Sequence, residues 1–372
     1  MLDSLALASA FFLNDSSFSE YETLEQRIDN TDLFQIAVRK ALELEKKAAY
    51  FARQTQYRAF LLCDPTNLAL GKLKHPAVSH TTKIHSSKAQ EIFQQLNTDP
   101  SPAFVLLTNN VLAKIGIAEF LQLRELTPHC LYIIQDYDCH HWYRMSAQCA
   151  LLADIYVPGH FHTPPYVSLI ASHPIKTIPI GSIQWEMDFL LENLPAILSQ
   201  DRPVAISGKH SLYARFPYRN KLIATFGNAF PNVGFTDTHQ FHQLTQEDKL
   251  RDWTSANLHF IAPVSCDVPI RVFDALVTGG KPVVPYAMAS WLCAIDIPDD
   301  MFELYGPQDL VAPDQALTRW LSNKGVIAPS LRHEATLNAL NRFHLDAVLH
   351  QLVSTTGHIL KPMQHPQLHS LH

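Results

Sequence analysis

The stretch that decides the fold runs from Leu258 to Ala287 and reads LHFIAPVSCDVPIRVFDALVTGGKPVVPYA. Two apolar runs, at residues 258–264 and 282–285, are typical of strands that are buried on both faces. Between them, residues 269–276 carry apolar side chains at helical spacing. A strand, a helix and a second strand in this order form the unit from which parallel α/β sheets are built.

The ends of this helix carry recognisable signals. Pro269 suits a first helical position because its missing N–H would have no partner there, and Asp267 can accept from the free amides of the first turn. Gly279 and Gly280 stand where glycine commonly ends a helix. Ligands of parallel sheets bind where a strand ends and the next helix begins, so Asp267 and Pro269 are placed near such a ligand.

Arg271 and Asp274 lie three positions apart on the helix and share a face. They form either an ordinary surface ion pair or a contact for a ligand, and the pattern leaves both open. A helix amino terminus has free N–H groups and a partial positive charge, which favours anions. We therefore expect a phosphate-bearing ligand near Arg271.

Residues 267–284, DVPIRVFDALVTGGKPVV, resemble the nucleotide-sugar-binding segment of GT-B glycosyltransferases. The resemblance covers roughly residues 200–320 and implies an α/β fold with two Rossmann-like lobes whose parallel sheets face a cleft. It implies that Asp274 binds the donor ribose and that Asp267 lies near the donor sugar. The family more often has Glu at both positions, with a slightly longer spacing between them. The remaining donor-binding residues that the segment implies are Pro269, Arg271, Gly279 and Gly280.

A basic group precedes this segment. Residues 202–206 are typical of a strand, and the basic residues that follow are Lys209, His210, Arg215, Arg219 and Lys221. Such a density of basic residues is unusual in a chain with 17% charged residues. It points to a phosphate, because binding a phosphate requires concentrated positive charge. A solvated helix face is the alternative. The resemblance implies that these residues bind the donor's phosphates, with Lys209 and Lys221 as first choices.

A second cluster of chemically active side chains lies in residues 131–142, LYIIQDYDCHHW. An apolar run predicts a strand, and the polar residues that follow it are Asp136, Asp138, His140 and His141. Oxygen and imidazole ligands suit zinc or manganese, but no further ligand motif accompanies them. We favour a place in the cleft, where Asp136, Asp138, His140 or Asp267 orients the acceptor hydroxyl or serves as base. A purely structural role is the alternative.

Residues 156–165, YVPGHFHTPP, follow another short predicted strand and form a candidate cleft loop. His160 and His162 in this loop, like His141, would approach a donor phosphate or an acceptor hydroxyl. Ordinary turn chemistry in a segment rich in Pro and Gly is an equal alternative.

Composition sets the outer limits. A chain of 372 residues with 47% apolar content favours two domains. A net charge of −6 without a basic tail argues against a nucleic-acid-binding protein. The cysteines show no paired spacing, as expected of reduced thiols in the cytoplasm. Residues 5–13 are apolar but too short to span a bilayer, so we expect no transmembrane segment and at most peripheral contact with the inner face of a membrane.

Strands and helices alternate along the chain. Strands are expected at 59–63, 104–107, 131–135, 155–157, 177–180, 204–206, 233–235, 258–264, 282–285 and 294–297. Helices are expected at 32–54, 88–96, 112–123, 145–153, 185–198, 269–276 and 331–352. This pattern predicts one lobe at 1–198, a second lobe at 199–330, a C-terminal helix at 331–353, and a polar, disordered tail at 354–372. The resemblance implies that the first lobe faces the acceptor and that the second binds the nucleotide sugar.

The resulting hypothesis is a GT-B glycosyltransferase that moves a sugar from a UDP-, GDP- or CMP-sugar to a glycan, a lipid-linked acceptor or another hydroxyl. Surface-glycan synthesis of the bacterial type and retention of configuration are its finer expectations, and a required metal is not favoured. The alternatives are a metal-dependent hydrolase, using Asp136, Asp138, His140 and His141, and a GT-B-like binding protein without activity. The chain has no GxGxxG and no P-loop, which argues against a dinucleotide dehydrogenase and a P-loop ATPase.

Overall fold

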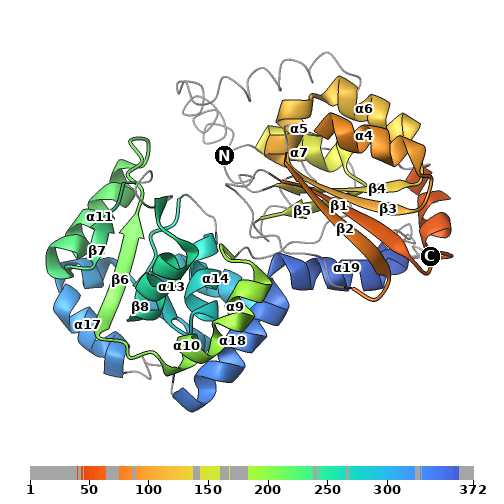
Figure 1. Cartoon of the computed structure of the whole chain (residues 1–372). Helices are drawn as coiled ribbons and strands as arrows, with labels where there is room; N and C mark the ends of the chain where they lie inside the picture. The colour runs from red at the N-terminus through yellow and green to blue at the C-terminus, as the bar shows by residue number, and fades with distance from the viewer. Residues whose placement is uncertain are drawn as a thin grey trace, which may run out of the picture.

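The computed structural model describes residues 40, 43–44, 46–63, 75–85, 89–136, 143–159, 167, 183–237, 241, 243–264, 268–322, 327 and 329–359. In this part of the chain the strands form two sheets of five strands each, and their neighbouring strands are parallel. Helices flank each sheet, and the sheets belong to separate lobes (Figure 1). The predicted α/β class with two Rossmann-like lobes is confirmed.

The first sheet has the strand order β2-β1-β3-β4-β5. Its strands are β1 (Tyr57–Cys63), β2 (Val78–His85), β3 (Ala103–Thr108), β4 (Cys130–Asp136) and β5 (Ile155–Pro158). Every residue of β3, β4 and β5 is buried, since these strands carry apolar side chains toward two separate cores. β2 was not predicted from the sequence because its residues, VSHTTKIH, are largely polar, as suits a strand at the edge of a sheet.

The helices of the first lobe follow the predicted alternation. They are α4 (Ala89–Thr98), α5 (Asn109–Ile115), α6 (Ile117–Leu126) and α7 (Tyr143–Leu152). The single helix expected at 112–123 is wrong, because Gly116 separates α5 from α6. Gly116 has a φ of 88°, which glycine adopts without strain, and its N–H bonds to the carbonyl of Leu112 at 2.9 Å.

The second sheet has the order β10-β9-β8-β6-β7. Its strands are β6 (Val204–His210), β7 (Val233–Phe235), β8 (Ala256–Phe260), β9 (Lys281–Pro285) and β10 (Glu303–Tyr305). The strand expected at 294–297 is wrong, since the chain there leaves a helix through a turn in which Asp296 has a φ of 54°. β10 takes its place, and three residues are too few to show a period in the sequence.

Helices cover both faces of the second sheet (Figure 1). They are α9 (Met187–Glu192), α10 (Leu194–Ser199), α11 (Pro217–Ala229), α13 (Gln246–Thr254), α14 (Ile270–Val277), α15 (Ala289–Ala294), α16 (Pro307–Val311) and α17 (Pro313–Ser322), with the 3₁₀ helices η3 (Tyr286–Met288) and η4 (Asp299–Met301). Where one helix was expected at 185–198, α9 and α10 meet at Asn193.

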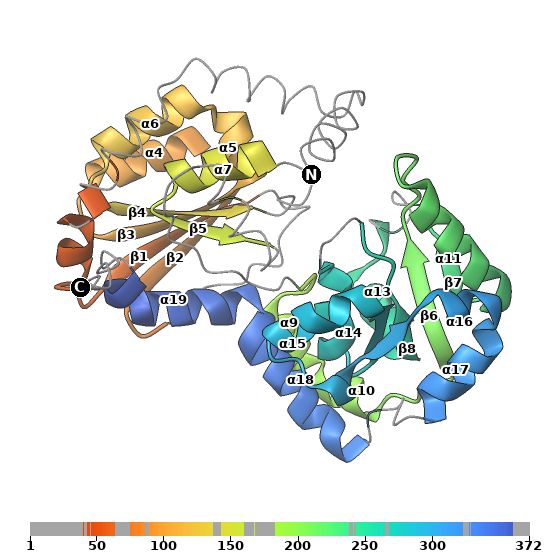
Figure 2. The ribbon, with the colours of Figure 1, turned by 180° about the vertical axis from the view of Figure 1, so that it is seen from behind.

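The expected C-terminal helix is two helices, α18 (Pro329–Phe343) and α19 (Leu345–Ile359). Residues of α18 join the core on the α14 face of the second sheet, whereas Leu345 and Val348 of α19 join a core of the first sheet. Figure 2 shows α19 leaving α18 to run along the first lobe. Residues 354–359, expected in a disordered tail, are therefore helical, and 360–372 lie outside the described residues. Across the described helices, none is long and apolar enough for a membrane span.

Candidate functional site

The second sheet has a switch point between β6 and β8. The helix after β6, α11, packs Phe226 into the core on one face of the sheet, and the helix after β8, α14, packs Val272 into the core on the other. A crevice outside the carboxyl ends of two such strands is the usual ligand site of an open α/β sheet. The ends of β6 and β8 are His210 and Phe260.

Arg219 of α11 spans this switch point. Its Nε donates to the carbonyl of Ala262, just after β8, at 3.1 Å, and its Nη1 donates to the carbonyl of Ser211, just after β6, at 2.9 Å. Its guanidinium also lies 5.0 Å from the centre of the Tyr213 ring. These contacts come from different segments, so they fix the guanidinium in one place.

His210 is buried beside Arg219. Its Nε2 lies 3.1 Å from the carbonyl oxygen of Phe260, and its Nδ1 lies 3.4 Å from Nη2 of Arg219. A carbonyl only accepts, so we assign the proton to Nε2, which leaves Nδ1 to accept from the arginine. Burial, together with the charges of Arg271 and Arg219, holds the pKa of His210 well below its ordinary value. The imidazole is therefore neutral at pH 7 and positions Arg219.

Arg271, in the first turn of α14, is half-buried. It makes no hydrogen bond and no ion pair with another residue that the structure describes. Burial lowers its pKa to about 10; Asp274 opposes that shift, and Arg219 adds to it. The guanidinium stays charged at neutral pH, and its donors lack the acceptor that an anion would supply.

Asp274, expected from the resemblance to bind the donor ribose, contacts Gln184. Its side chain is buried, and its two carboxylate oxygens lie 3.0 Å from the backbone nitrogen of Gln184 and 3.1 Å from that residue's Nε2. The carboxyl group therefore ties the segment before α9 to α14. Sequence reasoning missed Gln184, since it lies 90 positions away.

The carboxyl group of Asp274 gives a prediction for the pH dependence of stability. Burial raises its pKa to about 8, although the hydrogen bonds from Gln184 and the charge of Arg271 lower it. In the unfolded chain the carboxyl has an ordinary pKa of about 3.9. Between these values the folded protein keeps a proton that the unfolded chain releases, so this group makes the free energy of unfolding fall as pH rises from about 4 to about 8.

The Asp274→Asn variant lacks this titration and serves as the reference. Urea unfolding of both proteins at several pH values should show the wild type losing stability relative to the variant between pH 5 and pH 8. The expected loss in the free energy of unfolding is about 1.4 kcal/mol for each pH unit between pH 5 and pH 8. A difference between the two proteins that stays constant with pH would contradict the assignment.

The structure does not bring all the predicted cations together. Neighbouring residues of a strand point to opposite faces, so Lys209 points away from His210. Burial raises the pKa of Asp252 in α13, and the positive charge of Lys209 opposes this shift. The ammonium group of Lys209 therefore lies near α13. Lys221 is exposed on α11, and Arg215 is half-buried in the loop before that helix. His210 and Arg271, with Arg219, form the basic cluster.

The remaining donor-segment residues lie at opposite ends of α14. Pro269 is the N-cap, so the helix begins one residue later than expected, close to Arg271. Gly279 and Gly280 close the other end: their N–H groups bond to the carbonyls of Leu276 at 3.1 Å and Ala275 at 2.9 Å. Gly279 has a φ of 72°. Because they precede β9, the two glycines lie at the amino edge of the sheet and outside the cluster.

In the first lobe, polar side chains gather at the carboxyl ends of β3, β4 and β5. Asp136 is buried, and its Oδ2 accepts from the Tyr156 hydroxyl at 2.7 Å. Asn109 and Gln135 are completely buried, and among the described residues neither the oxygen nor the nitrogen of either amide has a hydrogen-bond partner. The register pairs Gln135 with Thr108, directly before Asn109, so the two amides stand at neighbouring strand ends. The sequence predicted Asp136 here but gave no signal for the amides.

Six predicted site residues lie outside the described residues: Asp138, His140, His141, His160, His162 and Asp267. Within the described ranges, no group of three or more His, Cys, Asp and Glu side chains is placed to hold a metal ion.

Comparisons with known proteins bear on the fold. No protein-family model matches the sequence, and no curated protein matches it. HepE from Anabaena, solved in complex with UDP and glucose, is similar with a TM-score of 0.45 and 9% identity, covering 82% of this chain and 99% of that chain. Sucrose-phosphate synthase from Thermosynechococcus elongatus is similar with a TM-score of 0.47 and 14% identity, covering 84% and 91%. Both likenesses concern the fold alone.

Proposed function

We propose that the protein is a glycosyltransferase that moves a sugar from a nucleotide-sugar donor to a hydroxyl acceptor. One observation carries the proposal: Arg271, half-buried at the switch point, has no hydrogen-bond or ion-pair partner in the part of the chain that is described. A poorly solvated cation without an acceptor is unfavourable. The diphosphate of an activated sugar supplies that acceptor, and its oxygens match the forked geometry of a guanidinium.

On the donor side, Arg271 and Arg219 bind the diphosphate. The two guanidinium groups stabilise the negative charge that develops on the diphosphate as its bond to the sugar breaks. Such electrostatic stabilisation is usually the largest single contribution to catalysis. His210 stays neutral and holds Arg219 through the bond between Nδ1 and Nη2. The amino terminus of α14, with Pro269 at its N-cap, adds free N–H groups that favour an anion.

In this proposal the acceptor binds at the carboxyl ends of β3, β4 and β5. The Oδ2 of Asp136 accepts from the Tyr156 hydroxyl, and a carboxylate at this place is the candidate base for the proton of an acceptor hydroxyl. Retention of configuration, surface-glycan synthesis and a cytoplasmic location rest on the sequence alone.

Turnover tests the proposal. Purified protein is incubated with UDP-, GDP- and CMP-sugars, with and without EDTA, and the released nucleotide is quantified by chromatography. We expect release from one donor class, faster with a glycan acceptor and unchanged by EDTA, because the guanidinium groups supply the positive charge. Activity that EDTA abolishes and zinc or manganese restores would support the metal-dependent hydrolase instead. Nucleotide binding without release would support the non-catalytic alternative.

A further inference from the structure

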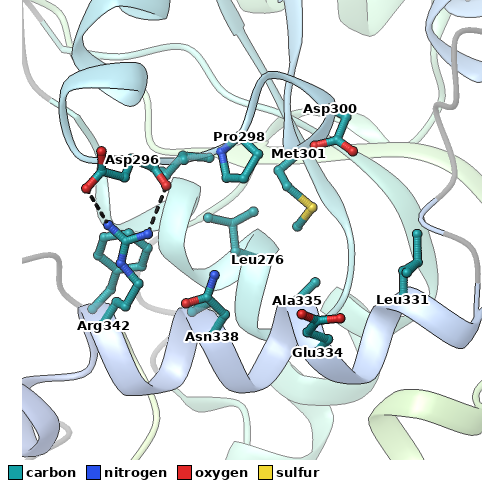
Figure 3. A pocket seen from close by; sticks show the side chains of 13 residues that line it. Leu276, Asp296, Pro298, Asp300, Met301, Leu331, Glu334, Ala335, Asn338 and Arg342 are labelled. Carbon is teal, nitrogen blue, oxygen red and sulfur yellow. Dashed lines mark hydrogen bonds and ion pairs between the residues drawn. The ribbon is translucent and has the colours of Figure 1, made fainter.

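A cavity of about 240 Å³ lies between α14, α18 and the turn that joins α15 to η4 (Figure 3). Leu276 of α14, Pro298 of the turn and Met301 of η4 give it an apolar floor. Asp300 of η4 and Glu334 of α18 stand on different walls. The cavity is therefore apolar inside and carries charged groups at its rim.

The cavity is separate from the basic cluster. Leu276 follows Arg271 by five positions on α14, which is about 7.5 Å along a helix axis. The cavity thus touches the carboxyl-terminal half of α14, whereas the phosphate-binding cations lie at its amino terminus. No residue of the proposed transferase site lines it.

The two ends of the cavity differ in charge. At one end Arg342 donates to the carbonyls of Ile295 at 2.8 Å and Asp296 at 2.9 Å, and to the Asp296 carboxylate at 3.2 Å, so this pair is neutral (Figure 3). At the other end, Asp300 and Glu334 are exposed and form no ion pair with any described residue. Two uncompensated carboxylates therefore border the apolar floor at that end.

We propose that this cavity binds a small organic ammonium ion with an aliphatic body. The ammonium group lies at the end of the cavity that carries Asp300 and Glu334, where the negative charge of these carboxylates attracts it. The aliphatic body covers Leu276 and Met301, and the flexible thioether of Met301 adapts to its shape. The volume is smaller than the roughly 300–1,000 Å³ of sites for drug-sized ligands, so the occupant is short.

Calorimetric titration with hexylammonium tests the proposal, with 1-hexanol and hexanoate as probes of the same length. We expect hexylammonium to bind at least tenfold more tightly than hexanol, with no measurable binding of hexanoate. The Asp300→Asn/Glu334→Gln double variant keeps the shape of both side chains and should weaken hexylammonium at least tenfold. Asp314→Asn, which neutralises an exposed carboxylate of α17, is the matched control and should bind as the wild type does.

Equal binding of hexylammonium and hexanol, or unchanged binding by the double variant, would overturn the proposal. So would an equal loss in Asp314→Asn. The test is independent of the proposed function, since the double variant should bind nucleotides normally and Arg271→Ala should bind hexylammonium normally. If one of the two proposed binding sites is disproved, the other proposal is therefore unaffected.

Discussion

Arg271→Ala is expected to weaken the binding of a nucleoside diphosphate by about ten- to a hundredfold. The variant removes charge-assisted hydrogen bonds, whose loss amounts to about 1.5–3 kcal/mol. The folded protein should remain intact, since Arg271 makes no hydrogen bond or ion pair with the residues that the structure describes. Isothermal titration with UDP, GDP and CDP measures the effect.

Arg251→Ala is the matched control for this prediction. Arg251 belongs to the same lobe, its side chain is 70% exposed, and it pairs with Asp248 at 3.3 Å on the surface of α13. Its removal changes the net charge equally but should leave nucleotide affinity unchanged. Equal losses in the two variants would mean that net charge alone attracts the nucleotide. Unchanged affinity in Arg271→Ala would remove this residue from the site.

Asp154→Asn is expected to destabilise the first lobe by about 3–5 kcal/mol. The buried carboxylate accepts from Arg124 at 2.7 Å, from Lys47 at 2.8 Å and from the backbone nitrogen of Tyr132 at 2.8 Å. Burial alone would raise the pKa of Asp154, but Arg124 and Lys47 hold it below its ordinary value. Neutralising Asp154 leaves the buried cations of Arg124 and Lys47 uncompensated, with the buried amine of Lys40 close by. Urea unfolding gives the free energy.

Asp99→Asn is the matched control, because Asp99 pairs with Arg58 at 3.1 Å with 48% of its side chain exposed, and asparagine keeps an oxygen that can accept from the Ser101 N–H. Solvent screens such a pair, so this variant should unfold at the same urea concentration as the wild type. If Asp154→Asn unfolded with the wild type as well, the network around Asp154 would not hold the lobe together.

The strands could be predicted wherever the residues themselves show which surfaces are buried. β3 and β4 are continuous apolar runs because cores lie on both their faces, so their sequences identify them within one or two residues. The unit β8–α14–β9 was predicted for the same reason, together with the glycines that end its helix. β2 and β10 were missed, since an edge strand can be polar and a strand of three residues shows no period.

Breaks within helices depend on contacts that a sequence does not display. The helix expected at 331–352 divides at His344, whose Nε2 lies 2.9 Å from the carbonyl of Trp185. That contact joins residues 159 positions apart, and the two halves of the helix then pack on different sheets. A local sequence pattern does not show that the two halves of a helix pack on different sheets.

The sequence predicted that basic side chains would gather after β6, but it did not predict which residues would do so. The density of cations after β6 led us to predict an anion site, and two of the residues named for it, Arg271 and His210, lie together with Arg219 in the basic cluster. Lys209 and Lys221 do not, because strand alternation turns one toward α13 and the outer surface of α11 exposes the other. The resemblance to GT-B enzymes implied that Asp274 binds the donor ribose, and in the structure its carboxyl group accepts hydrogen bonds from the distant residue Gln184.

The most direct test of the central claim, that Arg271 and Arg219 form a diphosphate site at the switch point, is calorimetric titration of each nucleoside diphosphate beside its nucleoside. We predict that one diphosphate binds at least tenfold more tightly than its nucleoside, and that the advantage shrinks as salt rises because salt screens the cations. A nucleoside that binds as tightly as its diphosphate, or the absence of binding by all of the diphosphates, would contradict the claim.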